Sequence, residues 1–411
     1  MLDRSIVPAV AAALEDTPVV FLNGARQAGK STLAKRLVEQ SLMAEYVTLD
    51  DPGALAAAQE DPGSFVAGRH RLVIDEVQRV PDLFLALKAT VDRDRRPGRF
   101  LLTGSANVLL LPGLARTLAG RMEILPLWPF SQGELESRKE GFIDAAFKGG
   151  AGLYKSTPPM ERRELLARIL SGGFPEAAGR KSDDRRNAWF SSYVGTLLQR
   201  EIRDLANVDG LAIMPRLLSL IATHAGSLLN YSELSRSSGL PLSTLKRYVA
   251  LWEATYLVQP VPAWSSNLGK RLVRSPKLYL NDSGLLAYLL QATPQRLSEQ
   301  PALWGPLLEN FVVMELHKQA AWSRTKPRLF HFRTHSGQEV DVLLEDRAGR
   351  LVGIEVKARA AASGEDFRAL RTLAADLGKR FVAGIVLYTG TAAYPFGPRM
   401  YALPVSALWR S

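Results

Sequence analysis

One segment limits the fold of this chain more than any other. It is the octapeptide Gly24-Ala25-Arg26-Gln27-Ala28-Gly29-Lys30-Ser31, followed directly by Thr32. It matches the pattern G-x-x-x-x-G-K-[ST], with an apolar run at 19–22 before it and a helical pattern at 33–38 after it. A strand, a glycine-rich loop and a helix in this order allow backbone N–H groups to surround phosphates. We therefore predict that residues 24–32 bind ATP, with Lys30 on the β- and γ-phosphates and Ser31 on Mg²⁺.

A pair of carboxylates follows the next predicted strand. The apolar run at 71–74 ends in Asp75 and Glu76, 45 residues after Lys30. At this position Asp75 is expected to hold Mg²⁺ through water, and Glu76 to orient and deprotonate the attacking water. The alternative, a solvated strand end, applies better to an Asp-Glu pair without a preceding phosphate loop.

A third predicted strand, at 100–102, ends in a polar stretch. Thr103, Ser105 and Asn107 are candidates for sensing the γ-phosphate and positioning the water. The strands alternate with helical patterns at 33–40 and 82–92, which favours an α/β fold with a parallel sheet wrapped by helices.

Two arginines follow this stretch, Arg116 and Arg121. Either is a candidate arginine finger that stabilises transition-state charge on the γ-phosphate of a neighbouring subunit. A surface salt bridge is the alternative interpretation for each.

The charge of the chain is unevenly distributed. The 411 residues carry a net charge of +11, which divides into −1 for residues 1–150, +7 for 151–300 and +5 for 301–411. This asymmetry indicates either a polyanionic partner for the later part of the chain or a solubilising surface.

The composition excludes several classes of protein. There are no cysteines, which excludes a disulfide scaffold and a thiolate metal site and fits a reducing cytosol. No run reaches the roughly 20 apolar residues that a membrane helix needs. We expect a soluble, cytoplasmic protein of two or three domains.

The middle of the chain has a helix-turn-helix pattern. Helical periodicity at 213–224 and 231–237 is followed by a turn at Gly239 and a second helix from Ser243 to 253, with Leu245, Val249 and Trp252 toward the core. Apolar runs at 256–258 and 277–280 are expected to flank a basic β-wing. The residues predicted to contact DNA are Thr244, Lys246, Arg247, Lys270, Arg271 and Arg274, with Tyr248 and Lys277 also available. A winged helix used only for domain packing is the alternative.

A third group of polar residues lies in the tail. Asp341 precedes Glu355 and Lys357 in the sequence. Glu355 and Lys357 are two residues apart on a predicted strand, so their side chains share one face. Asp341 and Glu355, with Glu309 from a helical stretch at 307–317, are candidate Mg²⁺ ligands, and Lys357 would assist a water nucleophile. This is the D…ExK layout of restriction-endonuclease-like enzymes. A buried ion-pair cluster without nuclease chemistry is the alternative.

Several stretches together resemble one known group. The chain is similar to prokaryotic AAA-type ATPases that join an ATPase core to an uncharacterised restriction-endonuclease-like C-terminal domain. The matching stretches are GARQAGKST, LVIDEVQRVP, LLTGSAN, LAGR, GGFPEA, LLQREIRDL, KLYLNDSGLLAYLL and EVD…IEVKA. The resemblance implies an AAA-like ATPase with Lys30, Ser31, Asp75 and Glu76 in its nucleotide site, and it also matches Gln78 and Arg121.

These observations combine into one expected organisation. We predict a P-loop AAA-like ATPase domain at 1–150, a helical segment with a winged helix at 151–295, and an α/β domain of the PD-(D/E)xK type at 296–411. The expected function is an ATP-hydrolysing, DNA-binding motor or remodeller that works as a homo-oligomer, a hexameric ring being one form. The alternatives are a nucleotide-gated, Mg²⁺-dependent nuclease and a signalling ATPase that acts through a protein partner.

Overall fold

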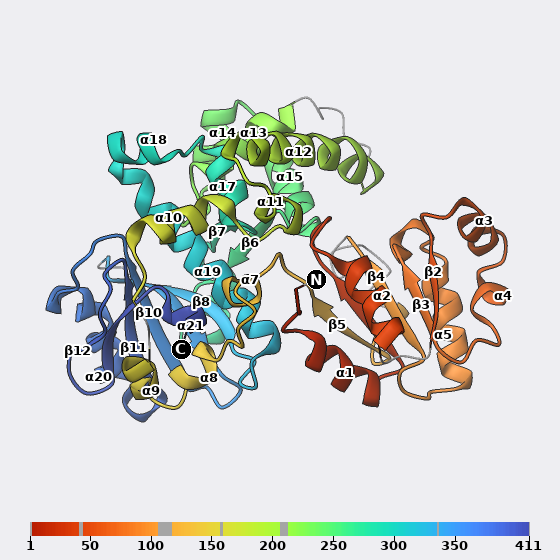
Figure 1. Cartoon of the computed structure of the whole chain (residues 1–411), viewed down its shortest axis with the longest axis horizontal. Coiled ribbons are helices and arrows are strands. Elements are labelled where there is room, and N and C mark those ends of the chain that lie inside the picture. The colour runs from red at the N-terminus through yellow and green to blue at the C-terminus, as the bar shows by residue number, and fades with distance from the viewer. Residues whose placement is uncertain are drawn as a thin grey trace. The chain divides into compact units, whose positions relative to one another are not determined.

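The computed structural model divides the chain into two compact units (Figure 1). It describes residues 2–40, 44–105, 117–156, 159–205, 213–334 and 337–410. The smaller unit consists of Arg4–Pro129 and Val249–Leu257, and the larger unit contains the remaining chain, Phe130–Tyr248 and Val258–Ser411 together with Met1–Asp3.

The smaller unit is built on a parallel sheet of five strands in the order β2-β3-β4-β1-β5. The strands are β1 (Val19–Asn23), β2 (Glu45–Thr48), β3 (Leu72–Asp75), β4 (Phe100–Gly104) and β5 (Met122–Pro126). The strands β1, β3 and β4 are apolar runs buried along their whole length, as expected for the centre of a parallel sheet. The α/β prediction for this part of the chain is confirmed.

Helices connect these strands and complete the core of the smaller unit. They are α1 (Val7–Asp16), α2 (Lys30–Gln40), α3 (Pro52–Glu60), α4 (Pro62–Val66) and α5 (Leu83–Arg93). The carboxylates of Asp51 and Asp61 cap α3 and α4, each accepting a backbone N–H of the first turn. Because the strands are parallel, the segments that follow β1, β3 and β4 all begin at the same edge of the sheet. This edge carries the predicted nucleotide site.

The first half of the larger unit is helical. Its helices are α7 (Gln132–Leu135), α8 (Phe142–Ala146), α9 (Ala151–Ser156), α10 (Arg162–Ser171), α11 (Pro175–Ala178), α12 (Asp183–Leu205), α13 (Met214–Ala222), α14 (Tyr231–Ser238), the first part of α15 (Leu242–Ala254, which belongs to the smaller unit from Val249 on), α16 (Leu268–Val273), α17 (Ser283–Leu289), α18 (Pro294–Glu299) and α19 (Trp304–Trp322). A two-stranded antiparallel ribbon, β6 (Val258–Val261) with β7 (Lys277–Leu280), interrupts them.

The second half of the larger unit is a mixed sheet of six strands in the order β12-β13-β11-β10-β9-β8. The strands are β8 (Arg328–Arg333), β9 (Glu339–Glu345), β10 (Leu351–Lys357), β11 (Phe381–Tyr388), β12 (Tyr394–Pro395) and β13 (Met400–Pro404), and the accompanying helices are α20 (Arg368–Leu377) and α21 (Ala407–Arg410). Gly353 and Gly384 leave room for Leu370 of α20, because a Cβ at either position would lie within 3.3 Å of that side chain. This packing places α20 directly on β10 and β11.

The segment at 130–150, which we expected in the ATPase domain, packs with the larger unit instead. The ammonium of Lys318 in α19 donates to the carbonyl of Phe130 at 2.9 Å, and the carboxylate of Glu315 accepts the N–H of Gln132 at 2.9 Å. The helix α9 follows this segment and packs against β13. Apart from Val249–Leu257, the segments 151–295 and 296–411 likewise belong to one compact unit.

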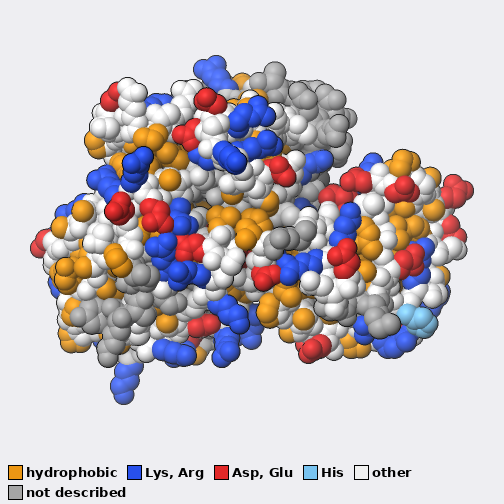
Figure 2. All heavy atoms as spheres, in the orientation of Figure 1, with side chains coloured by type: hydrophobic (Ala, Val, Ile, Leu, Met, Phe, Trp, Pro, Cys, Tyr) orange, Lys and Arg blue, Asp and Glu red, His pale blue; other side chains and the backbone are white. Residues whose placement is uncertain are grey.

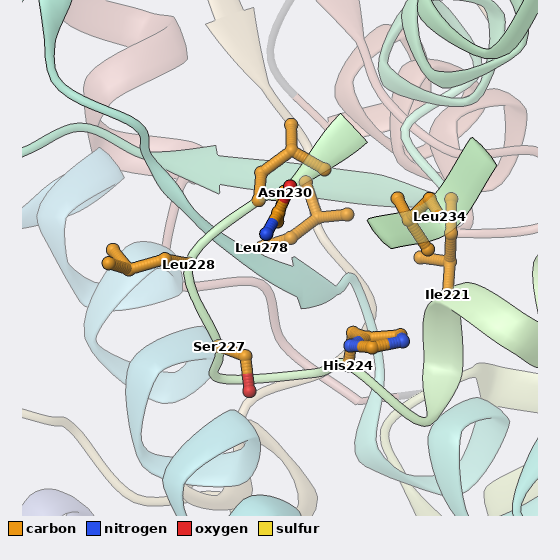
Figure 3. Close-up of a pocket in the computed structure, with 8 residues that line it drawn as sticks. Ile221, His224, Ser227, Leu228, Asn230, Leu234 and Leu278 are labelled. Carbon is orange, nitrogen blue, oxygen red and sulfur yellow. The ribbon is translucent and has the colours of Figure 1, made fainter. Parts of the chain in front are cut away.

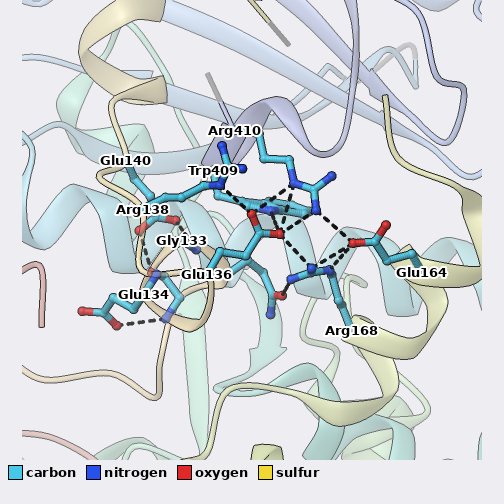
Figure 4. A network of polar contacts seen from close by, with 11 residues as sticks. Gly133, Glu134, Glu136, Arg138, Glu140, Glu164, Arg168, Trp409 and Arg410 are labelled. Atoms are coloured by element: carbon cyan, nitrogen blue, oxygen red, sulfur yellow. Dashed lines mark hydrogen bonds and ion pairs between the residues drawn. The ribbon is translucent and has the colours of Figure 1, made fainter. Parts of the chain in front are cut away.

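A network of ion pairs ties the C-terminal helix α21 to this segment (Figure 4). The carboxylate of Glu136 accepts from Arg410 at 2.7 Å and from the indole N–H of Trp409 at 3.2 Å, and it pairs with Arg168 of α10 at 2.7 Å. Partial burial alone would raise the pKa of Glu136, but the bonds from Arg410 and the charge of Arg168 outweigh it and hold that pKa below its usual range. The network therefore fixes the last residues of the chain as part of the structure.

The helix-turn-helix pattern corresponds to α13, α14 and α15, but two of its details were wrong. Gly239 ends α14 at φ 73°, as predicted for a turn. However, α15 begins at Leu242, so Ser243 lies inside the helix and does not cap it. Tyr248, which we expected to face outward, is 2% exposed, together with the buried Leu245. Among the described residues no helix has the length and apolarity to cross a bilayer.

Candidate functional site

The phosphate loop between β1 and α2 wraps tightly against the segment after β5. Gly24 has φ 149°, and a Cβ there would lie 2.1 Å from the carbonyl oxygen of Leu127. Gly29 has φ 97°, also a conformation that favours glycine. Lys30 is 4% exposed, and its ammonium donates to the carbonyls of Gly24 and Ala25 at 3.0 and 2.9 Å. The loop backbone and the Lys30 charge thus converge on one point.

The other predicted loop residues differ in exposure. Ala25 and Ala28 are buried, Arg26 and Ser31 are half-buried, and Gln27 and Thr32 are exposed. Gln27 adopts a left-handed conformation at φ 59°, which turns the tip of the loop.

The carboxylate of Asp75 accepts hydrogen bonds from hydroxyl groups of three other elements. Its Oδ1 accepts from Ser31 of α2 at 3.0 Å and from Thr103 of β4. Its Oδ2 accepts from Tyr46 at 2.8 Å and from Thr48 at 3.4 Å, both on β2. Burial and the bond to Asp75 raise the pKa of Tyr46 above its usual range, so this hydroxyl stays protonated and donates.

Glu76 has a strained backbone and a side chain held by a neighbour. Its φ of 59° is left-handed, a conformation that occurs in non-glycine residues chiefly where the surroundings enforce it. Its N–H donates to the Thr103 hydroxyl at 3.1 Å, and its Oε2 accepts from the Gln78 amide at 2.5 Å. The same amide donates to Ser105 at 3.1 Å. Thr103 and Ser105 therefore both belong to the site, whereas Asn107 lies outside the described residues.

Arg4 braces the phosphate loop from outside the motif. Its guanidinium donates to the carbonyl of Ala28 at 3.2 Å and to that of Trp128 at 2.5 Å. Sequence reasoning missed Arg4, because it precedes the motif by twenty residues and no pattern connects the two. It also missed Tyr46 and Thr48, whose two-residue spacing on a strand was the available indication.

Arg121 immediately precedes β5. It lies where the strands β1 and β5 begin, whereas the phosphate loop lies where β1 ends. The register pairs Val19 with Met122, so Arg121 lies beside the first residue of β1, and the loop follows its last. The Arg121 guanidinium pairs with Asp92 of α5 at 2.6 Å and lowers the pKa of that carboxyl. Arg121 therefore does not serve the nucleotide site of its own chain. Arg116 lies outside the described residues.

The larger unit brings the four predicted tail residues together. The last pair of opposing residues between the antiparallel strands β9 and β10 is Val342 with Ile354. Asp341 and Glu355 are the next residue on each strand beyond this pair. Asp341 Oδ2 accepts the N–H of Val356 at 2.9 Å, and Lys357 donates to Glu355 at 3.0 Å.

Glu309 of α19 reaches the same cluster through Lys277, a residue that we expected on a basic wing. The Lys277 ammonium lies 2.9 Å from Glu309 and 3.5 Å from Asp341. Burial and the charge of Asp341 raise the pKa of Glu309 to about 7 and that of Glu355 to about 9. Within the described ranges, no three or more His, Cys, Asp or Glu side chains are arranged to hold a metal ion.

The predicted DNA-contact residues fall into two groups. Lys246 and Arg247 are exposed on α15, and Thr244 beside them is half-buried. The segment at 258–280 differs from the expected wing, because α16 lies between the ribbon strands. There Arg271 pairs with Glu345 at 2.6 Å, and its guanidinium lies over the rings of Trp264 and Phe330. Arg271 and Lys277 are structural residues, so their assignment to DNA was wrong.

The remaining member of the basic segment is Arg274, which is half-buried and donates to the carbonyl of Arg333 at 3.3 Å. Nothing is described of the Lys270 side chain.

The larger unit also contains a small hollow between the end of α13 and β7 (Figure 3). Apolar side chains of Ile221, Leu234 and Leu278 line it together with His224 and Asn230. Its volume of about 10 Å³ has room for about one water molecule, so it does not serve as a ligand pocket.

Comparison with known proteins agrees with the geometry of the smaller unit. A family model described as an AAA domain matches residues 16–136, which contain the phosphate loop, Asp75 and Glu76. Two models described as domains of unknown function match residues 162–296 and 304–408. The chain is therefore an ATPase of the AAA class.

Two similar proteins define the family of this chain more narrowly than the AAA domain does. Uncharacterized proteins of Mycobacterium tuberculosis and Mycobacterium bovis are each 32% identical over 398 residues, covering 96% of this chain and 82% of theirs. The chain belongs to the family of these two proteins.

Solved structures give a weaker likeness. RuvB of Thermotoga maritima matches at 19% identity with a TM-score of 0.30, covering 64% of this chain and 90% of that chain. DnaA of Aquifex aeolicus bound to AMPPCP matches at 12% identity with a TM-score of 0.28, covering 60% of this chain and 86% of that chain.

The Thr103 hydroxyl contacts both Asp75 and Glu76. We predict that Thr103→Val, which keeps the shape but removes this hydroxyl, lowers kcat for ATP hydrolysis by about 10- to 100-fold with a smaller effect on KM. Steady-state ATPase assays measure both constants. Thr48→Val is the matched control, because its hydroxyl lies 3.4 Å from the same carboxylate and contributes less. An unchanged kcat in Thr103→Val would show that this hydroxyl does not position the pair.

Proposed function

We propose that this AAA ATPase is a DNA-binding motor or remodeller that works as a homo-oligomer. The observation that carries the proposal is the edge of the smaller unit's sheet where the phosphate loop with Lys30 lies beside Asp75 and Glu76, which are linked to it and to β4 through Ser31 and Thr103. A second observation concerns the rest of the chain, since residues 151–411 carry the whole positive excess of the sequence.

The residues at this edge have the chemistry that ATP hydrolysis needs. The loop N–H groups and Lys30 would hold the phosphates. The Ser31 hydroxyl and the Asp75 carboxylate, with oxygens 3.0 Å apart, are donors of the kind that Mg²⁺ prefers, so they fit a magnesium ion bound with ATP. Such an ion neutralises charge that develops on the phosphates. Glu76, held by Gln78, would accept the proton of the attacking water.

The DNA contacts that we propose lie on α15. Lys246 and Arg247 are adjacent and exposed, and Thr244 begins the same turn of the helix. In Figure 2, Lys and Arg side chains are spread over the helical part of the larger unit, interspersed with acidic ones. A cationic helix of this kind binds phosphate or enters a groove. With Arg271 and Lys277 engaged in ion pairs, α15 supports this proposal better than the β6–β7 ribbon does.

We also propose that Arg121 acts in trans. It lies opposite the phosphate loop in its own chain, so a nucleotide that it contacts must belong to a neighbouring subunit. This role requires Arg121 to leave Asp92, an exchange of one anionic partner for another.

For the rest of the chain, we propose that the division at 1–150, 151–295 and 296–411 reflects ancestry, since the three family models match residues 16–136, 162–296 and 304–408, within one residue of these limits. We further propose that the last segment descends from restriction-endonuclease-like domains. The convergence of Glu309, Asp341, Glu355 and Lys357 supports this relation in fold.

Two substitutions separate nucleotide binding from hydrolysis. Lys30→Ala removes the main phosphate contact and is expected to weaken ATP binding by roughly 100-fold or more. Glu76→Gln keeps the shape of the site but removes the proton acceptor, so it is expected to bind ATP and lose turnover. Fluorescent-nucleotide titration and phosphate release measure the two properties. Normal turnover in Glu76→Gln would contradict the role of Glu76.

The trans role of Arg121 is tested by mixing variants. Arg121→Ala and Lys30→Ala proteins are each expected to be inactive, for different reasons. Mixed oligomers contain interfaces where an intact nucleotide site faces an intact Arg121, so hydrolysis should be partly restored. Phosphate release is measured against the mixing ratio, with Lys30→Ala plus Glu76→Gln as the control, because both of these changes lie at the nucleotide site. Mixtures as inactive as their components would argue against the trans role.

The DNA proposal is tested on α15. The double variant Lys246→Glu/Arg247→Glu should bind duplex DNA about 10-fold or more weakly and reduce the salt slope of log K by about 2. The control is Arg347→Glu/Lys379→Glu, which makes the same charge change at exposed positions of the mixed-sheet half. Binding is measured by fluorescence anisotropy over a salt series, with ATPase rates recorded with and without DNA. Equal losses in both variants would mean that net charge, and not α15, is responsible.

A further inference from the structure

Three carboxylates of the larger unit surround one ammonium group. They are Glu309 of α19 and Glu339 and Asp341 of β9, and Glu355 of β10 stands beside Asp341. The Lys277 Nζ lies 2.5 Å from Glu339 Oε1, 2.9 Å from Glu309 Oε1 and 3.5 Å from Asp341 Oδ1. The Lys277 side chain is 4% exposed, so this is a buried contact.

Lys277 is held in this position by its strand. Lys277 and Tyr279 are two apart on β7 and share a face, and the Tyr279 hydroxyl donates to the same Glu309 oxygen at 2.6 Å. The residue after Glu309 in α19 is Asn310. Its side-chain amide accepts the N–H of Leu280 at 2.8 Å and donates to the carbonyl of Leu280 at 3.0 Å. Two adjacent residues of α19 thus fix β7 and direct Lys277 into the carboxylates. A surface lysine would not be fixed in this way.

The ammonium lies at the centre of these carboxylates, which among the described residues are not arranged to hold a metal ion while it is there. A divalent cation in such a cluster needs several oxygen ligands around one centre. Here Nζ is that centre for three carboxylates from two elements, and the second oxygen of Asp341 is engaged by the Val356 N–H. A buried ammonium and a metal ion at this point would repel each other and compete for the same oxygens.

We propose that Lys277 takes the place of a divalent cation in the carboxylate cluster of the C-terminal segment. The segment therefore keeps the residue set of a nuclease-like site, but it uses that set as a metal-free ion-pair lock between β7 and the sheet. It does not cleave phosphodiester bonds by a metal-dependent route. This inference concerns the larger unit alone and does not depend on the proposed DNA motor function.

The substitution Lys277→Ala tests the proposal, because it removes the ammonium and leaves the carboxylates. The full-length variant is expected to bind one more Mn²⁺ per chain than the wild type, measured calorimetrically without nucleotide. The additional site should disappear in the double variant Lys277→Ala/Asp341→Asn. Lys318→Ala is the matched control, since Lys318 is also a buried lysine paired with a glutamate, but lies outside the cluster. A folded Lys277→Ala protein that binds no additional Mn²⁺ would overturn the proposal.

A second measurement keeps Lys277 in place and does not require that Lys277→Ala folds. The thermal unfolding of the wild type is followed with millimolar Mn²⁺ and with chelator, in parallel with Asp341→Asn. We expect the wild-type midpoint not to depend on Mn²⁺ through this cluster. A Mn²⁺-dependent increase that Asp341→Asn abolishes, or Mn²⁺-dependent plasmid cleavage with the same sensitivity, would show a metal site in the wild type and overturn the proposal.

Discussion

The nucleotide site depends on one buried carboxylate. The Asp75 carboxylate accepts hydrogen bonds from hydroxyl groups on α2, β2 and β4. A single side chain therefore fixes the spacing of these three elements at the edge of the parallel sheet. A buried carboxylate without such donors would be costly, whereas one satisfied from several directions makes its surroundings rigid. The position of Ser31 relative to Thr103, and through Thr103 that of Glu76, follows from this arrangement.

The parts of the structure that were predictable from sequence are those determined locally. The phosphate loop needs its glycines because Gly24 and Gly29 have positive φ, and the central strands are apolar because both of their faces are covered. Asp75 and Glu76 were predictable because they follow a strand at the same edge. Tyr46 and Arg4 were not, since each reaches the site from a distant part of the chain without a motif of its own.

In the basic segment around 270, by contrast, the sequence suggested a role in DNA binding for residues that the fold uses in ion pairs. A run of cations without acidic residues was interpreted as a DNA-binding wing, yet Arg271 and Lys277 find their anions at Glu345 and Glu309, remote in sequence. Charge counted along a chain says nothing about the partners that folding supplies. The exposed Lys246 and Arg247 show which part of the predicted basic surface is available, and burial is what separates the two cases.

One contact at the phosphate loop has a mechanical consequence. Arg4 joins the carbonyl of Ala28, inside the loop, to that of Trp128, and the chain leaves the smaller unit after Pro129. The backbone of Leu127 also donates to Asn23 at 2.6 Å, just before the loop. Two short links therefore connect the loop to the last residues before the exit. A displacement of the Ala28 carbonyl is therefore passed through the Arg4 guanidinium to Trp128 without crossing the sheet.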